Sequence, residues 1–193
     1  MGPALAVLET TSIARGYVAL DAMAKRAPVT VLHAEPISPG KFWVAIAGGE
    51  AEVEEALAAG VERADAQRLD DVLLHYAHPA VLAAVAGGVR LAPPDGSVGV
   101  LELSSIAAAV RAADAAMKCA DVSLVDLHLA RGVGGKGYLV IAGELADVEA
   151  SLDAGRDAAG EANVVGRELM PRPDEAVAQA AARPRSSLRG DGR

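Results

Sequence analysis

The sequence predicts an α+β fold made of two tandem ferredoxin-like domains, each with the split β-α-β order. The first observation is an internal repeat: VLE at residues 7–9 returns at 100–102, and the Gly-Lys pair at 40–41 returns at 135–136. These offsets of 93 and 95 residues indicate a duplicated domain, because solenoid units repeat every ~20–50 residues. The second observation is that each copy reads strand, helix, strand, strand, helix, strand. That order predicts a four-stranded antiparallel sheet with two helices on one face.

The first strand and helix of the first copy are read from an apolar run and a capping signal. Residues 4–8 form an apolar run that is typical of a buried strand. Thr11 or Ser12 caps a helix beginning near Ile13, because a side-chain oxygen there accepts a bond from a first-turn amide. Apolar residues then recur at helical spacing, and the second copy repeats the stripe from Ile106. Pro28 ends the helix, since proline excludes a helical conformation before it.

The remaining elements follow in the order that the fold needs. Residues 29–34 are rich in β-branched side chains and residues 42–47 form a second strand, with a turn-rich loop between them. A second helix opens near Glu50, whose charge suits the positive end of a helix. Residues 70–74 are the fourth strand and residues 79–85 a short helix. We therefore place the first domain at 4–86, a linker at 87–97, the second domain at 98–182 and a disordered tail at 183–193.

Composition excludes several classes of partner. The chain of 193 residues has a net charge of −8, so no nucleic-acid partner is expected. No signal peptide and no long apolar span is apparent, so no membrane partner is expected either. The single cysteine, Cys119, fits a cytosolic setting. Hydrophobic residues make up 52% of the chain but aromatics only 3%, which predicts a thin core that gains stability from surface buried on the twin domain or on other subunits.

Two motifs that could bind a nucleotide or a metal fail their context tests. Residues 132–137 match GxGxxG, but a strand rather than a helix follows, and Gly137 stands where a phosphate-binding loop needs Ser or Thr. We interpret the segment as a hairpin loop. His75 and His78 lie three residues apart, but no further ligand is placed beside them, so no metal site is expected. Cys119 is interpreted as a structural thiol.

Two pairs of charged residues recur at matching positions. Glu9 and Glu102 each end a strand, where acid–base chemistry is one interpretation and acceptance of backbone hydrogen bonds is the favoured one. Lys25 and Lys118 each end the first helix of a copy, where a cation suits the helix dipole. Lateral packing of one protein on another is a second, compatible role for the lysines.

Together these motifs resemble the shell domain of bacterial microcompartments, in its unpermuted form. They are VLExxSI at 7–13 and 100–106, DAxxK at 21–25 and 114–118, ISPGKF at 37–42, GVGGK at 132–136 and MPRP at 170–173. Two such domains in tandem resemble the trimeric shell proteins, notably those of propanediol-utilisation compartments. The resemblance covers nearly the whole chain.

The resemblance implies a structural protein, not an enzyme, located in a microcompartment shell in the cytoplasm. Three chains would form a flat pseudohexameric tile, a homotrimer that packs beside other shell hexamers and pentamers. The helix-end Lys25 and Lys118 and the arginine Arg172 would lie on the tile edge. In the first copy we align His78 with Arg172, as a further edge residue.

The resemblance also implies a central pore for small polar metabolites. Its lining would come from the two loops, namely Ile37, Ser38, Pro39, Gly40, Lys41, Gly132, Val133, Gly134, Gly135 and Lys136. Some relatives hold an iron–sulfur cluster through a cysteine at the position of Ser38. A neutral hydroxyl does not replace a thiolate ligand, so we expect no cofactor and disfavour an electron-transfer role. A small-ligand-sensing module is the other alternative.

Overall fold

The computed structural model describes residues 3–87, 96–129 and 132–182. The predicted tail at 183–193 and most of the predicted linker lie outside these residues. The first domain comprises β1 (Ala4–Thr10), α1 (Ile13–Arg26), β2 (Thr30–Ile37), β3 (Lys41–Gly48), α2 (Glu50–Ala64), η1 (Asp65–Gln67), β4 (Arg68–Leu74) and α3 (Pro79–Val85). The second domain comprises β5 (Ser97–Leu103), α4 (Ile106–Cys119), β6 (Val122–Leu129), β7 (Gly137–Gly143), α5 (Leu145–Ala159), η2 (Glu161–Asn163), β8 (Val164–Met170) and α6 (Glu175–Ala182).

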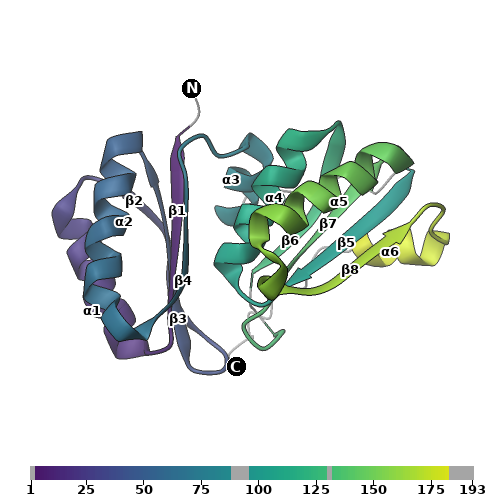
Figure 1. Cartoon of the computed structure of the whole chain (residues 1–193). Helices are drawn as coiled ribbons and strands as arrows, with labels where there is room; N and C mark the ends of the chain where they lie inside the picture. Colours follow the sequence, from purple (N-terminus) through teal and green to yellow (C-terminus); the bar gives the residue numbers. More distant parts are fainter. Residues whose placement is uncertain (1–2, 88–95, 130–131, 183–193) are drawn as a thin grey trace, which may run out of the picture.

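Each domain has one antiparallel four-stranded sheet, as predicted. The strand orders are β2-β3-β1-β4 and β6-β7-β5-β8, so the first strand of each copy lies inside its sheet. The registers also correspond: Val7 pairs with Ala45, and its counterpart Val100 pairs with Val140. In the first domain α1 and α2 cover one face of the sheet, and α4 and α5 do the same in the second (Figure 1).

Local sequence explains where the first helix of each copy begins. The Ser12 side chain accepts a hydrogen bond from the amide of Arg15, so Ser12 rather than Thr11 is the cap. Ser105 caps α4 in the same way through Ala108. An N-cap hydroxyl of this kind satisfies an amide that has no partner inside its own helix.

The two copies use opposite size combinations where the first helix crosses the third strand. A Cβ atom added at Gly16 would lie 2.4 Å from Cδ1 of Phe42. In the second copy the counterparts are Ala109 and Gly137, and there a Cβ at Gly137 would lie 2.5 Å from Cβ of Ala109. Helix and strand approach closely in both domains because one member of each pair is glycine.

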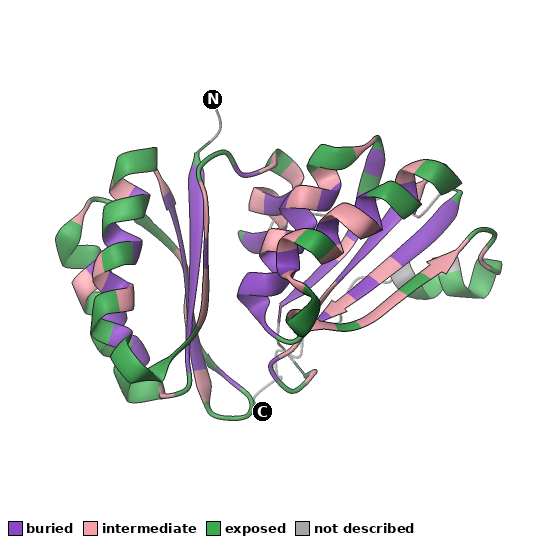
Figure 2. Ribbon diagram, in the orientation of Figure 1, coloured by how far each residue is buried: buried purple, intermediate pink, exposed green. Residues whose placement is uncertain are grey.

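The largest core is shared between the domains. One apolar cluster packs α1 and α2 on the first sheet. A second cluster joins α4 with the other face of the first sheet, so α4 lies between that sheet and its own (Figures 1 and 2). Most of the buried residues of α4 are alanines, whose small side chains allow close packing on both sides of the helix. The high content of small residues is therefore explained in part by α4, a helix that is buried on two sides.

Candidate functional site

We call the contact surface between the two domains the seam, and Glu9 lies in it beside the start of α4. Glu9 is the next-to-last residue of β1 and is fully buried, and its Oε1 accepts a 2.8 Å hydrogen bond from the amide of Ala107 in α4. Its Oε2 has no hydrogen-bond partner among the described residues. Burial, with a smaller contribution from the charge of Asp70, raises the pKa of Glu9 to about 7, although the hydrogen bond from Ala107 and the charge of Lys41 lower it. Acceptance of a backbone hydrogen bond is confirmed for Glu9, and the donor lies in the other domain.

A polar cluster of Asp70, Ser105 and Arg111 borders Glu9. Asp70 in β4 accepts a 2.5 Å hydrogen bond from Ser105 Oγ, and its other oxygen lies 3.3 Å from the guanidinium of Arg111. Arg111 also donates to the backbone oxygen of Asp71 at 2.6 Å. The cluster was missed from the sequence. The sequence does carry a signal for it, because the two copies differ at these positions. Arg111 of the second copy corresponds to Val18 of the first, and Asp70 of the first copy corresponds to Gly166 of the second.

The end of α4 is fixed to the first domain by Lys118 and Asp114. Lys118 Nζ donates to the backbone oxygen of Tyr76 and to Asp114, both at 2.5 Å. Asp114 in turn accepts the amide of His78 at 2.7 Å. The Lys118 side chain remains 44% exposed, so the seam contact is compatible with a second contact at an edge.

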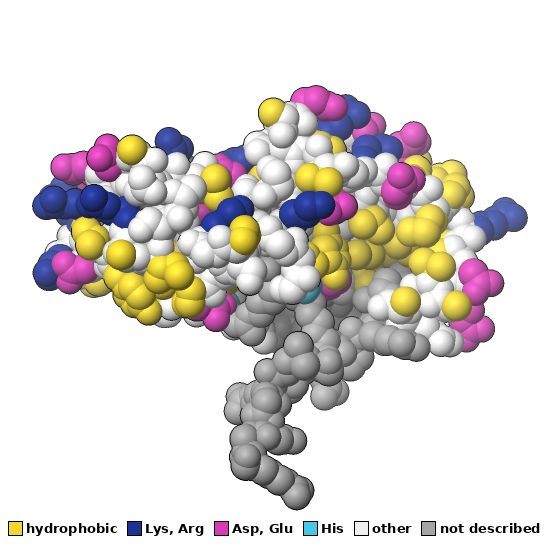
Figure 3. Space-filling model, turned by 90° about the horizontal axis from the view of Figure 1, so that it is seen from below, with side chains coloured by type: hydrophobic (Ala, Val, Ile, Leu, Met, Phe, Trp, Pro, Cys, Tyr) yellow, Lys and Arg dark blue, Asp and Glu magenta, His cyan; other side chains and the backbone are white. Residues whose placement is uncertain are grey.

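The matching face of α1 has no such cover. Ile13 and Tyr17 are 38% and 55% exposed, whereas their counterparts Ile106 and Val110 in α4 are fully buried. Hydrophobic side chains lie in separate groups on the underside of the molecule, over the first and the second domain (Figure 3). The same helix face is therefore covered in the second copy and open to solvent in the first.

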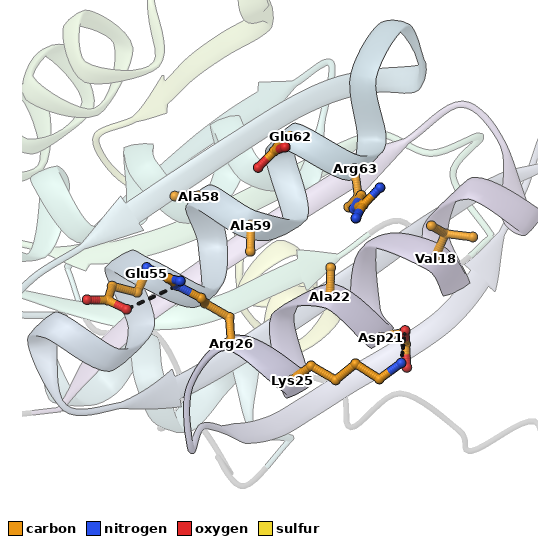
Figure 4. Close-up of a pocket in the computed structure, with 10 residues that line it drawn as sticks. All are labelled: Val18, Asp21, Ala22, Lys25, Arg26, Glu55, Ala58, Ala59, Glu62 and Arg63. Atoms are coloured by element: carbon orange, nitrogen blue, oxygen red, sulfur yellow. Dashed lines mark hydrogen bonds and ion pairs between the residues drawn. The ribbon is translucent and has the colours of Figure 1, made fainter.

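Four of the six charged side chains that line the groove between α1 and α2 form ion pairs with each other. It has a volume of about 660 Å³ and an alanine floor. Lys25 points to Asp21 at 2.7 Å, and Arg26 to Glu55 at 3.1 Å (Figure 4). The Lys25 side chain is 74% exposed, unlike Lys118, because nothing covers this end of α1.

The alignment of His78 with Arg172 is wrong. The strand registers make the last residue of β4 the counterpart of the last residue of β8. Two residues further on, Tyr76 corresponds to Arg172, and His78 corresponds to Asp174. His78 caps α3, its Nδ1 accepting the amide of Ala80, and its own amide belongs to the seam. Pro79 and Pro173, which follow His78 and Arg172, are not counterparts, since the register places them two residues apart.

The two predicted pore loops meet each other. A Cβ at Gly135 would lie 2.9 Å from the backbone oxygen of Ser38 and 3.0 Å from Nζ of Lys41. Ser38, Pro39 and Gly40 are exposed, as are Gly132 and Gly134, while Val133 and Lys136 are half-buried. Ile37 differs from the expectation, since its apolar side chain is 7% exposed and belongs to the shared core. The buried Ile37 side chain therefore cannot line a pore, whereas the exposed Ser38, Pro39 and Gly40 can.

The remaining candidate residues serve local structure. The GxGxxG segment leads directly into β7, so no helix follows it. His75 lies 3.1 Å from Glu50 at the start of α2, and His78 caps α3, so the two histidines serve different elements. Cys119 is exposed at the end of α4. Among the described residues, no helix is long and apolar enough to cross a membrane.

Comparison with known proteins identifies the family. The family profile described as BMC domain matches residues 4–81 and 97–173. The chain belongs to the BMC-domain family. It is 39% identical over 178 residues to the bacterial microcompartment shell protein PduT of Citrobacter freundii, across 92% of this chain and 96% of that protein.

Solved structures of microcompartment proteins have the same fold. The crystal structure of a microcompartments protein from Desulfitobacterium hafniense DCB superposes with a TM-score of 0.81 and 37% identity, across 92% of this chain and 98% of that one. A fused permuted hexameric shell protein of the RMM microcompartment has a TM-score of 0.62 at 24% identity, across 81% and 83%, and shows the shared fold. This BMC-domain chain is therefore a structural protein of a microcompartment shell.

Proposed function

We propose that three copies of this chain form a flat pseudohexameric tile in a microcompartment shell. The observation that carries the proposal is the unequal exposure of two corresponding helix faces. In α4 the face that includes Ile106 is buried against the first sheet, and in α1 the face that includes Ile13 is open. A second copy of the chain supplies a sheet of the same design to cover it.

The covering surface is the counterpart of the one that covers α4. The second sheet carries a separate apolar cluster of Val98, Val125, Val140 and Ala142. Val98 and Val140 correspond to Leu5 and Ala45, which pack in the shared core beside α4. A contact between two different surfaces of identical chains repeats head to tail, and it either closes into a ring or grows into a filament. Three two-domain chains in a closed ring give six domains around one axis.

The two loops would then surround the axis of the tile. Ser38, Pro39 and Gly40 lie beside the loop at 132–136 through the contact of Gly135 with Ser38. Three copies of each loop, with hydroxyl and backbone groups exposed, would make an opening for small polar metabolites. Ser38 offers no thiolate, which argues for an opening without a cluster. We propose a transport and building role, with no catalysis.

The outer edges of the tile would contact other shell hexamers and pentamers. Lys25, with its exposed ammonium, and Arg172, in the exposed segment after β8, are the main edge residues. Lys118 takes part while keeping its seam contact. His78 is left out of the edge, because Tyr76 corresponds to Arg172 and because the amide and ring of His78 already have partners in this chain.

Mass measurement in solution, followed by electron microscopy after mixing with a single-domain shell hexamer, tests this function. We expect a trimer that enters flat sheets or closed shells. Arg172→Asp should lower incorporation into sheets and leave the trimer intact. A monomer, or a trimer that binds a metabolite tightly and ignores the hexamer, would instead support the ligand-sensing alternative.

A further inference from the structure

We propose that Glu102 caps helix α1 of a second copy of this chain, accepting the backbone amide of Ala14. The proposal rests on the trimer proposed above and assigns a residue contact to its interface. It makes Glu102 an assembly residue, in the same way that Glu9 joins the two domains of one chain.

The seam provides the template for this contact. Glu9 is the next-to-last residue of β1, and its carboxylate accepts a 2.8 Å hydrogen bond from the second amide of α4, that of Ala107. A carboxylate at this place suits both the unpaired first-turn amides and the positive end of the helix dipole. The bond forms between domains, so the same pair of surfaces on two chains can form it as well.

Glu102 occupies the position of Glu9 in the second sheet. Glu9 pairs with Trp43 in the neighbouring strand, and Glu102 pairs with the corresponding Tyr138. The side chain of Glu102 is 39% exposed, however, whereas Glu9 is fully buried. The difference arises because α4 covers Glu9 and no helix start covers Glu102 in this chain.

The salt bridge that Glu102 makes in the single chain leaves room for this contact. Lys136 Nζ lies 2.8 Å from Oε1 of Glu102. Its counterpart Lys41 interacts electrostatically with Glu9 in the seam, and Glu9 still accepts a hydrogen bond from the amide of Ala107. A carboxylate has two oxygens, so Glu102 can hold Lys136 and accept an amide at the same time.

Helix α1 has the matching unfilled end. It begins after a serine cap, Ser12, as α4 begins after Ser105, and its first turn contains no acidic residue. Ala14, the second residue of the helix, is the counterpart of Ala107. The neighbouring Ile13 and Tyr17 are exposed where their counterparts in α4 are buried, so the start of α1 lies at the edge of an open apolar face. In the trimer, a second copy would bury these apolar side chains and its Glu102 would accept the amide of Ala14, as the first domain does for α4.

The test compares the full-length chain with Glu102→Ala and Glu102→Gln by mass measurement over a dilution series. We expect Glu102→Ala to raise the concentration at which the trimer dissociates by at least about tenfold, as loss of a hydrogen bond to a charged group does. Glu102→Gln keeps an acceptor oxygen and should lose less. Glu149→Ala is the matched control, since Glu149 is an exposed carboxylate on α5, away from the strand end.

Hydrogen exchange in the trimer provides a readout specific to the contact. The amide of Ala14 should exchange slowly in the wild type and faster in Glu102→Ala, whereas the amide of Ala107 should stay protected in both. Unchanged dissociation and unchanged protection of Ala14 in folded Glu102→Ala would overturn the cap and leave the tile standing. A wild-type chain that stays monomeric at all concentrations would overturn the tile, and the cap with it.

Discussion

The carboxylate of Glu9 accepts a hydrogen bond from the amide of Ala107, 98 residues further along the chain. The bond joins the end of a strand in one domain to the start of a helix in the other, inside a shared apolar core. A BMC-domain protein with this contact cannot be two independent units, because separating the domains would expose α4. The unfolding of both domains should therefore be a single cooperative transition.

The pH dependence of stability should report on Glu9. Its pKa is raised from 4.5 to about 7 in the folded chain, so the native state binds more protons than the unfolded state between these values. The free energy of unfolding should accordingly fall as pH rises through this window, by up to about 3 kcal/mol from this group. Glu9→Gln should remove that part of the slope in urea unfolding. Glu54→Gln, at an exposed position on α2, should leave the slope unchanged, and an unchanged slope in Glu9→Gln would contradict the assignment.

Asp70 and Arg111 should be energetically coupled across the seam. Their side chains are mostly buried and 3.3 Å apart, so removing either leaves a charge without its partner. Asp70→Ala and Arg111→Ala should each destabilise the chain, and the double variant should lose less than their sum, with a coupling of about 1–2 kcal/mol. The exposed pair Arg26 and Glu55 is the control, with an expected coupling below about 0.5 kcal/mol. Additive losses at Asp70 and Arg111 would show that the contact does not hold the domains together.

Gly16→Ala should destabilise the first domain. The added Cβ would meet Phe42 at 2.4 Å, and overpacking of this kind costs about 1–3 kcal/mol, more than alanine gains in a helix. Thermal unfolding measures the loss. The same substitution in a Phe42→Leu background should cost less, because a smaller side chain faces the helix. Equal costs in both backgrounds would mean that the helix moves instead of clashing.

The charged seam cluster can be transplanted to the proposed interface between chains. Val18 and Gly166 stand at the positions of Arg111 and Asp70, and a Cβ at Gly166 meets nothing closer than 3.7 Å. Val18→Arg together with Gly166→Asp should tighten the trimer in low salt by roughly tenfold, since partly desolvated pairs couple by about 1–2 kcal/mol. Dissociation on dilution measures this. Each single variant should gain little, and a double variant no tighter than the singles would argue against equivalent interfaces.

The predicted elements correspond closely to the observed ones because their signals are local. The short helix after β4 spans Pro79–Val85 as expected, fixed by a proline at its start, and Ser12 caps α1 as one of two predicted candidates. Strands were longer than predicted: β1 continues to Thr10. Polar residues at a strand end carry no apolar signal, although their backbone groups still pair with the neighbouring strands.

The sequence by itself determined the duplication, the strand and helix order, the family resemblance and the residues of the two loops. These depend on local patterns and on similarity between the two copies. Only the tertiary structure decided that Glu9 reaches Ala107, that Arg111 pairs with Asp70, that Ile37 is buried and that Tyr76 matches Arg172. Each depends on how one domain packs on the other or on strand register. Corresponding segments of a duplicated chain have different surroundings, because the first sheet covers α4 and no sheet of this chain covers the same face of α1.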